Sequence, residues 1–182
     1  HQLFEADIFS DVCFGPKNLG LPAEEIEKRA KEALEQVGIA GKLYKQSPFE
    51  LSGGQKRRVA IAGVLAMQPK VLILDEPAAG LDPKGRSEIL DLVKDLHKNM
   101  GLTIILVSHS MEDVAEYVDR IIVMDKARIF MDASPKEVFS HSKELIEIGL
   151  DIPFATKICG ALKNLGWDIS TDIITRDEAV KE

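Results

Sequence analysis

The sequence predicts an α/β protein built on a parallel sheet, and three observations support this fold class. Two short apolar runs, Val71–Leu74 and Thr103–Val107, are too brief for helices, and a helical pattern separates them. A third apolar run follows at Ile121–Met124, after another short helical segment. Alternating strands and helices are typical of parallel α/β folds, in which ligands bind at the carboxyl ends of the strands. We expect the first two strands to be buried on both faces and the polar residues after them to face a site.

Composition excludes several classes of protein. The 182 residues suffice for one full domain, and 45% hydrophobic with 29% charged residues is the balance of a folded globular chain. The net charge of −7 argues against a nucleic-acid partner, because such proteins carry a basic surface. Apolar runs fall far short of the roughly 20 residues that span a membrane. Cys13 and Cys159 are expected to be buried core residues in a protein of a reducing compartment.

The first third of the chain is expected to be mainly helical. The apolar stretch over residues 2–20 contains a Gly-Pro pair and is expected to be a loop with short helical pieces. Pro22 suits the first turn of a helix that begins with several glutamates. Ser52 is a good N-cap for a helix that starts at Gly53. The inward face of that helix is predicted to be Val59, Ala60, Gly63, Val64 and Met67.

The remaining elements follow from the same signals. Apolar residues with helical spacing over 89–96 predict the helix that joins the first two strands. A short helix is predicted over Met111–Tyr117, and the third strand turns back near Ala127, where the lack of glycine suggests a loose or long turn. A tail begins near residue 140, and its helix carries Phe154, Ile158, Leu162 and Leu165.

The segment Leu51-Ser52-Gly53-Gly54-Gln55 places a hydroxyl and two glycines at the start of a predicted helix. Free backbone N–H groups and the positive end of the helix dipole favour an anion there, and glycine lets a phosphate approach the backbone. A capped helix with a flexible start would have the same sequence. The segment alone leaves both interpretations open.

Charged and polar side chains follow the first two predicted strands. Asp75 and Glu76 come after the first strand. One carboxylate can hold Mg²⁺, usually through water, and its neighbour can orient or deprotonate an attacking water. Solvated acids at the end of a strand are the alternative. His109 follows the second strand, where a histidine with only a structural role is the more common finding.

Together, and in this order, the segments resemble the nucleotide-binding subunit of an ATP-binding cassette (ABC) transporter. The family's motifs match the signature loop at Leu51–Gln55, the Walker B strand at Val71–Asp75, the D-loop at Ala79–Asp82 and the switch histidine at His109. The resemblance implies that Glu76 and His109 are catalytic and that Asp75 serves Mg²⁺. It also implies that ATP is bound by Leu51, Ser52, Gly53, Gly54, Gln55 and Asp82.

Further segments narrow the resemblance to the ATPase subunits of energy-coupling factor (ECF) importers, which take up vitamins and cobalt or nickel ions. These segments are residues 1–5, 14–20, 47–50, 55–62, 149–153 and 172–175. The resemblance therefore covers essentially the whole chain. It implies a peripheral ATPase on the cytoplasmic face of the cell membrane that couples ATP hydrolysis to uptake.

The implied fold is a P-loop NTPase-like ABC cassette. We expect the Q-loop region and helical signature subdomain at residues 1–66, a RecA-like half with the parallel sheet at 67–139, and a C-terminal extension at 140–182. The family's Walker A loop, Gly-x-x-x-x-Gly-Lys-Ser/Thr, is absent from the sequence. The chain is therefore expected to be truncated at its N-terminal side.

The resemblance also implies partners, because each ATP in the family lies between the phosphate loop of one cassette and the signature loop of another. These partners are a second ABC ATPase subunit, identical or related, a transmembrane coupling subunit and a substrate-binding membrane subunit. The apolar segment 3–14, with Leu3, Phe4 and Phe9, is expected either to dock the membrane subunit or to fill the helical core. The tail helix either pairs with the other ATPase or packs on its own domain.

Two other functions are compatible with the motifs. A soluble ABC ATPase that does not transport would carry the same motifs, although such proteins usually contain long insertions. A chain without the phosphate loop could also be an inactive half-site that only complements a partner.

Overall fold

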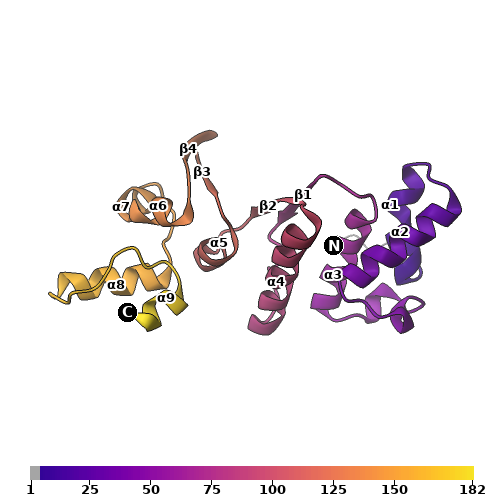
Figure 1. The fold of residues 1–182 in the computed structure, drawn as a ribbon, viewed down its shortest axis with the longest axis horizontal. Helices are drawn as coiled ribbons and strands as arrows, with labels where there is room; N and C mark the ends of the chain where they lie inside the picture. Colours follow the sequence, from indigo (N-terminus) through magenta and orange to yellow (C-terminus); the bar gives the residue numbers. More distant parts are fainter. Residues whose placement is uncertain (1–4) are drawn as a thin grey trace. The chain divides into compact units, whose positions relative to one another are not determined.

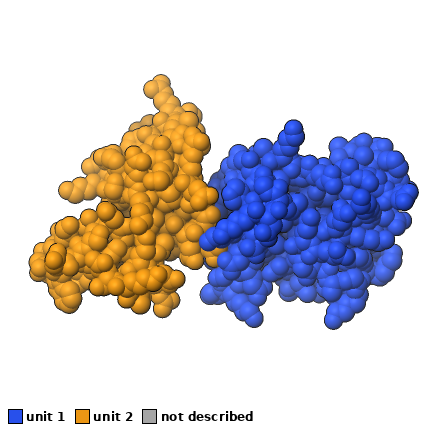
Figure 2. Space-filling view, in the orientation of Figure 1, with its two compact units in different colours: residues 1–107 blue, residues 108–182 orange. Residues whose placement is uncertain are grey.

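The computed structural model describes residues 5–182, and the chain divides into two compact units, residues 1–107 and 108–182 (Figure 2). The first unit contains α1 (Ile8–Asn18), α2 (Ala23–Gln36), the short 3-10 helices η1 (Gly41–Leu43) and η2 (Pro48–Glu50), α3 (Gly53–Leu65), β1 (Val71–Asp75), α4 (Pro83–Met100) and β2 (Thr103–Val107) (Figure 1). The second unit contains α5 (Met111–Tyr117), β3 (Ile121–Asp125), β4 (Arg128–Ala133), α6 (Pro135–Ser140), α7 (Ser142–Glu147), α8 (Phe154–Asn164) and α9 (Arg176–Lys181).

Helix α1 corrects the expectation of a loop with short helical pieces. Asp7 caps the helix, and its carboxylate accepts a hydrogen bond from the Ser10 N–H at 2.8 Å. Ile8 and Val12 lie one turn apart and are fully buried. Pro16 lies inside the helix and removes one backbone donor. Packing of the apolar stripe outweighs that loss, so the Gly-Pro pair does not break the helix.

Helices α1, α2 and α3 pack against one another around one apolar core. Helix α3 also touches α4, so its buried residues spread around the helix rather than along one stripe. They are Val59, Ile61, Ala62 and Leu65. The predicted inward face is therefore wrong at Val64, which is exposed, and it omits three of the residues that are buried.

Strands β1 and β2 form a parallel pair that α4 connects. The register runs from Val71 opposite Thr103 to Asp75 opposite Val107. This unit confirms the predicted strand–helix–strand arrangement. Leu72 and Leu74 belong to the helical core, but Ile73 on the other face of β1 is 65% exposed. The expectation of burial on both faces is wrong, because among the described residues helices cover only one face of the pair.

Strand β3 pairs antiparallel with β4, which confirms the predicted turn near Ala127. Among the described residues β3 does not pair with β1 or β2, so the expectation of a third parallel strand is wrong. The turn between β3 and β4 contains only Lys126 and Ala127, with φ of 47° and 60°. Positive φ at both positions is typical of the tight two-residue hairpin turn. The turn is therefore short, and not loose as the missing glycine suggested, because Ala127 adopts the left-handed conformation that glycine usually supplies.

The tail forms helix α8 where it was predicted. Its buried side consists of Ala155, Thr156 and Cys159, and the Thr156 hydroxyl donates a hydrogen bond to the Ile173 carbonyl at 2.9 Å. The predicted apolar side is exposed, since Phe154 is 65% and Leu165 is 77% accessible. Cys159, like Cys13, is buried as expected. Within residues 5–182, no helix is long and apolar enough to cross a membrane.

Candidate functional site

The predicted signature loop lies at the N-terminus of α3, where Ser52 is the N-cap as predicted. The Ser52 hydroxyl accepts a hydrogen bond from the Gln55 N–H at 3.3 Å, and the Gln55 side-chain oxygen accepts one from the Ser52 N–H at 3.0 Å. This capping box holds Ser52 and Gln55 to each other. Leu51, just before the cap, is buried in the helical core. The loop is therefore anchored on both sides of its two glycines.

The first turn of α3 fits an anion better than the first turn of α2 does. It contains no acidic residue, whereas Glu24 and Glu25 occupy the first turn of α2. A Cβ at Gly53 would lie 3.3 Å from the Leu81 side chain, and a Cβ at Gly54 would have no heavy atom within 4 Å. Gly54 thus leaves its backbone open, and the first turn of α3 contributes no carboxylate that would offset the helix dipole.

Asp75 and Glu76 lie at the carboxyl end of β1, as predicted. Asp75 is the last residue of the strand and is exposed. Glu76 has a left-handed backbone with φ of 46° and is partly buried. Its N–H donates to the Val107 carbonyl at 2.9 Å, and its own carbonyl accepts from the Ala79 N–H at 3.2 Å. The Glu76 backbone is therefore held between the end of β2 and the following turn.

The predicted D-loop follows directly. Gly80 has φ of 74°, a conformation that glycine adopts without strain. Asp82 is the N-cap of α4, and its carboxylate accepts a hydrogen bond from the Gly85 N–H at 2.6 Å. Together with the approach of Leu81 to Gly53, this turn brings the start of α4 beside the start of α3. The first unit thus gathers the signature loop, the two carboxylates and the D-loop.

His109 belongs to the second unit, two residues beyond β2. It is exposed, and the neighbouring Ser108 hydroxyl accepts a hydrogen bond from the Ser110 N–H at 3.1 Å. Ser110 then caps α5. The catalytic assignment of His109 stays a prediction.

One residue near the carboxylates was not singled out from the sequence. The Arg57 guanidinium, on α3, donates from Nη2 to the Glu76 carbonyl at 3.3 Å. Burial lowers the pKa of Arg57. Helical spacing contained a signal for this position, because Arg57 precedes the buried Ile61 by one turn.

The predicted docking segment 3–14 contains Leu3, Phe4 and Phe9. Leu3 and Phe4 lie outside the described residues, so only Phe9 can be placed. The Phe9 ring stacks on Tyr44 with ring centroids 5.5 Å apart, and the Lys31 ammonium lies 5.9 Å from its centroid. Phe9 therefore packs within the helical part of the chain. For this residue the structure favours the core over a membrane-protein contact.

No group of three or more histidine, cysteine or acidic side chains within residues 5–182 is arranged to hold a metal ion. A different requirement applies to Mg²⁺ bound with a nucleotide, which needs one or two carboxylates beside phosphate oxygens and water. The exposed Asp75 carboxylate fits that requirement.

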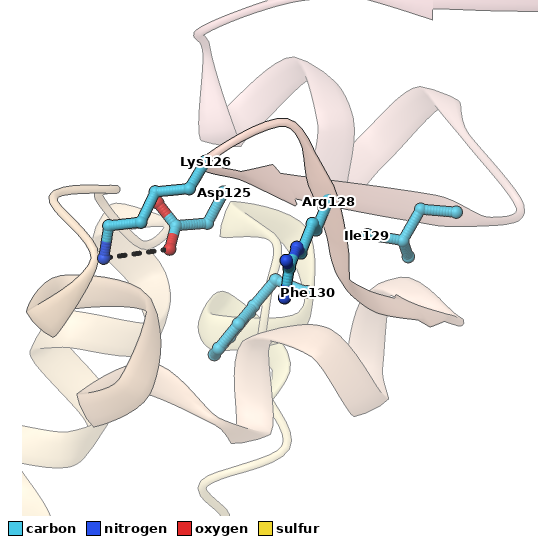
Figure 3. Close-up of a pocket in the computed structure, with 5 residues that line it drawn as sticks. All are labelled: Asp125, Lys126, Arg128, Ile129 and Phe130. Atoms are coloured by element: carbon cyan, nitrogen blue, oxygen red, sulfur yellow. Dashed lines mark ion pairs between the residues drawn. The ribbon is translucent and has the colours of Figure 1, made fainter.

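A surface hollow of about 510 Å³ lies on the β3–β4 hairpin (Figure 3). Its lining residues are Asp125, Lys126, Arg128, Ile129 and Phe130, and the Lys126 ammonium lies 3.6 Å from the Asp125 carboxylate. None of the predicted nucleotide residues lines it.

Comparisons with known proteins show what this chain resembles. Residues 2–79 match the family model described as ABC transporter. The energy-coupling factor transporter ATP-binding protein EcfA2 of Symbiobacterium thermophilum is 56% identical over 180 residues, which is 99% of this chain and 62% of that protein. EcfA2 of Clostridium tetani is 56% identical over 100% of this chain and 64% of its own length. The chain thus spans less than two thirds of these relatives.

Solved structures of ABC transporter proteins also resemble this chain. The cbiO1 protein of Clostridium perfringens, described as part of the ABC transporter complex cbiONQ, matches with a TM-score of 0.70 and 46% identity over 91% of this chain and 61% of that one. A dimeric ATP-binding cassette bound to ADP and Pi matches with a TM-score of 0.58 and 28% identity over 73% and 61% of the two chains.

The fold matches that of solved ATP-binding cassettes, a mixed α/β structure with a parallel sheet, which confirms the predicted fold class. The chain is similar over nearly its whole length to ABC transporter ATP-binding proteins.

Proposed function

We propose that the chain is the signature-loop, Walker B and D-loop portion of an ATP-hydrolysing subunit of an ECF importer. The observation that carries the proposal is the 56% identity to a protein named EcfA2 over 99% of this chain. The anion-compatible start of α3 and the two carboxylates at the end of β1 supply the matching chemistry. The predicted divisions at 1–66, 67–139 and 140–182 belong to the same proposal.

Each candidate residue receives one task in hydrolysis. Backbone N–H groups of Gly53 and Gly54, with the Ser52 hydroxyl, hold the γ-phosphate of a nucleotide whose other side belongs to a second cassette. Leu51 and Gln55 keep this loop in place, and Asp82 fixes the neighbouring D-loop. Donors fixed before the reaction stabilise charge in the transition state without reorganisation.

At the chain's own nucleotide, Asp75 serves Mg²⁺, which neutralises phosphate charge when bound. Glu76 accepts a hydrogen bond from the attacking water, and His109 contacts the γ-phosphate. Water attacks phosphorus in line with the bond to the leaving group. Glu76 orients this water and accepts its proton as the new bond to phosphorus forms and the bond to the leaving group breaks.

The proposed partners are a second ABC ATPase subunit, a transmembrane coupling subunit and a substrate-binding membrane subunit. These place the protein at the cytoplasmic face of the membrane, where ATP hydrolysis drives uptake of a vitamin or a transition-metal ion. The exposed side of α8, with Phe154 and Leu165, is a surface that a second ATPase subunit could cover.

Replacement Glu76→Gln in the full gene product, assembled with its partners, tests the proposal. The amide keeps the size of the side chain but accepts a water proton poorly, so we expect ATP hydrolysis to fall by about 100-fold or more while nucleotide binding persists. Glu32→Gln on the exposed face of α2 is the matched control and should hydrolyse ATP at the unsubstituted rate. Undiminished hydrolysis by Glu76→Gln would exclude Glu76 from the reaction.

A further inference from the structure

Two consecutive arginines on α3 make different contacts. Arg58 donates to the Val37 carbonyl at 3.0 Å and to the Glu88 carboxylate at 3.4 Å, so it ties α3 to neighbouring helical segments. Arg57 donates to the backbone carbonyl of Glu76 at 3.3 Å. Its Nε is buried and has no hydrogen-bond partner within the described part of the chain. A buried N–H without a partner costs free energy, so the contact that Arg57 does make among the described residues is informative.

The Glu76 backbone is held from three directions. Its N–H bonds to the carbonyl of Val107 in β2, and its carbonyl accepts from Ala79 in the following turn and from Arg57 in α3. Glu76 also keeps a left-handed φ of 46°, which a side-chain-bearing residue adopts only when its surroundings impose it. Because backbone angles set where a side chain points, a change at any of these contacts redirects the Glu76 carboxylate.

Helix α3 therefore contributes residues to both nucleotide sites in the proposed function. Its first turn, Ser52 to Gln55, is the segment that contacts the γ-phosphate held mainly by the other cassette. One turn further along the same rigid helix, Arg57 contacts the backbone of the residue that orients water at the chain's own nucleotide.

We propose that Arg57 is a positioning residue for Glu76, which links contact between the signature loop and phosphate in one site to alignment of the attacking water in the other. This inference rests on the proposed function. In this role Arg57 fixes the peptide that carries the carboxylate. A hydrogen bond from a charged donor is stronger than a neutral one, so it is suited to maintain the left-handed conformation.

Steady-state ATP hydrolysis by Arg57→Met and Arg57→Lys variants of the full gene product, in its assembled complex, tests the link. Misplacement of a reacting group by a fraction of an ångström lowers kcat, so we expect about a 10-fold loss for Arg57→Met with the KM for ATP changed less than about 2-fold. Arg57→Lys retains a cationic donor and should recover much of the loss. Arg29→Met is the matched control, because among the described residues Arg29 pairs only with Glu25 on α2, and it should leave kcat unchanged.

The same substitution in a Glu76→Gln background separates the two proposals. If Arg57 acts through Glu76, Arg57→Met adds less than about a 2-fold further loss to Glu76→Gln. An equal loss in both backgrounds, or an unchanged kcat per folded complex, would overturn the positioning role. Full activity of Glu76→Gln alone would instead reject the proposed function. Should Arg57→Met fold poorly, Arg57→Gln gives the same comparison with a polar side chain, and bound ATP per complex reports the folded fraction.

Discussion

The three-helix part of the first unit and its two-stranded sheet bury their apolar residues in different ways. Leu34 on α2 is fully buried, whereas Ile73 on β1 is 65% exposed although it is just as apolar. A helix needs cover along one stripe, and α1, α2 and α3 provide it for one another. A strand presents two faces, and among residues 5–182 helices cover only one of them. Apolar sequence thus predicts an element, but its burial depends on how many neighbours it has.

The largest expected effect is in the helical core. Leu34→Ala removes side-chain atoms from a site with no solvent access, so the free energy of unfolding should fall by about 2–5 kcal/mol. Denaturant unfolding followed by circular dichroism measures this change. Leu19→Ala is the control just beyond α1, where the side chain is 56% exposed, and it should cost less than about 1 kcal/mol. Equal costs at the two positions would contradict the difference in packing.

Local signals in the sequence predict much of this first unit. Ser52 predicts the start of α3, and the brief apolar runs at Val71 and Thr103 predict β1 and β2. The same signals place Asp75 and Glu76 at a strand end. Local signals fail where distant contacts decide: α1 forms despite Pro16 because its stripe packs on other helices.

Arg57 shows how far the candidate site can be predicted from the sequence. Arg57 lies one helical turn before Ile61, and this spacing, which can be read from the sequence, places Arg57 on a buried side of α3. Its hydrogen-bond partner is the backbone carbonyl of Glu76. Every residue has such a carbonyl, so the residue types in the sequence cannot predict this contact. The exposure of one face of β1 and β2 likewise cannot be predicted from the sequence, because Ile73 and Leu72 have equally apolar side chains. Position relative to neighbours in space, not residue type, separates them.

An intermediate effect is expected at the start of the helical part, where Asp7 caps α1. The Ser10 backbone N–H is the main reason that the pKa of Asp7 is lowered, and burial opposes that shift. Because the folded pKa lies below the unfolded one, this stabilisation is full above the unfolded pKa and disappears as pH falls through the folded value. Asp7→Ala should therefore lower the free energy of unfolding by about 1 kcal/mol at pH 7.

The pH dependence supplies the control for this cap. The difference between the original chain and Asp7→Ala should shrink below about pH 4, as the carboxyl group takes up its proton. Asp7→Asn keeps an acceptor for the Ser10 N–H but cannot ionise, so it should retain most of the stability and lose that pH dependence. A constant difference between Asp7→Ala and the original chain from pH 7 to pH 2 would exclude the charge-dependent cap.

The smallest expected effect tests the open face of the sheet directly. Ile73→Thr keeps a β-branched side chain and exchanges an exposed apolar group for a polar one, so unfolding of this chain should change by less than about 0.5 kcal/mol. Leu72→Ala, one residue earlier and facing the core, should cost about 2 kcal/mol or more. A large cost for Ile73→Thr in this chain would mean that the face is buried and would remove the contrast with α1–α3. The same pair measured in the full gene product extends the comparison. If Ile73→Thr lowered the free energy of unfolding strongly in the full gene product but not in this chain, other residues of that product would cover β1 and β2. The sheet would then be buried on both faces, and its packing would resemble that of the helical core.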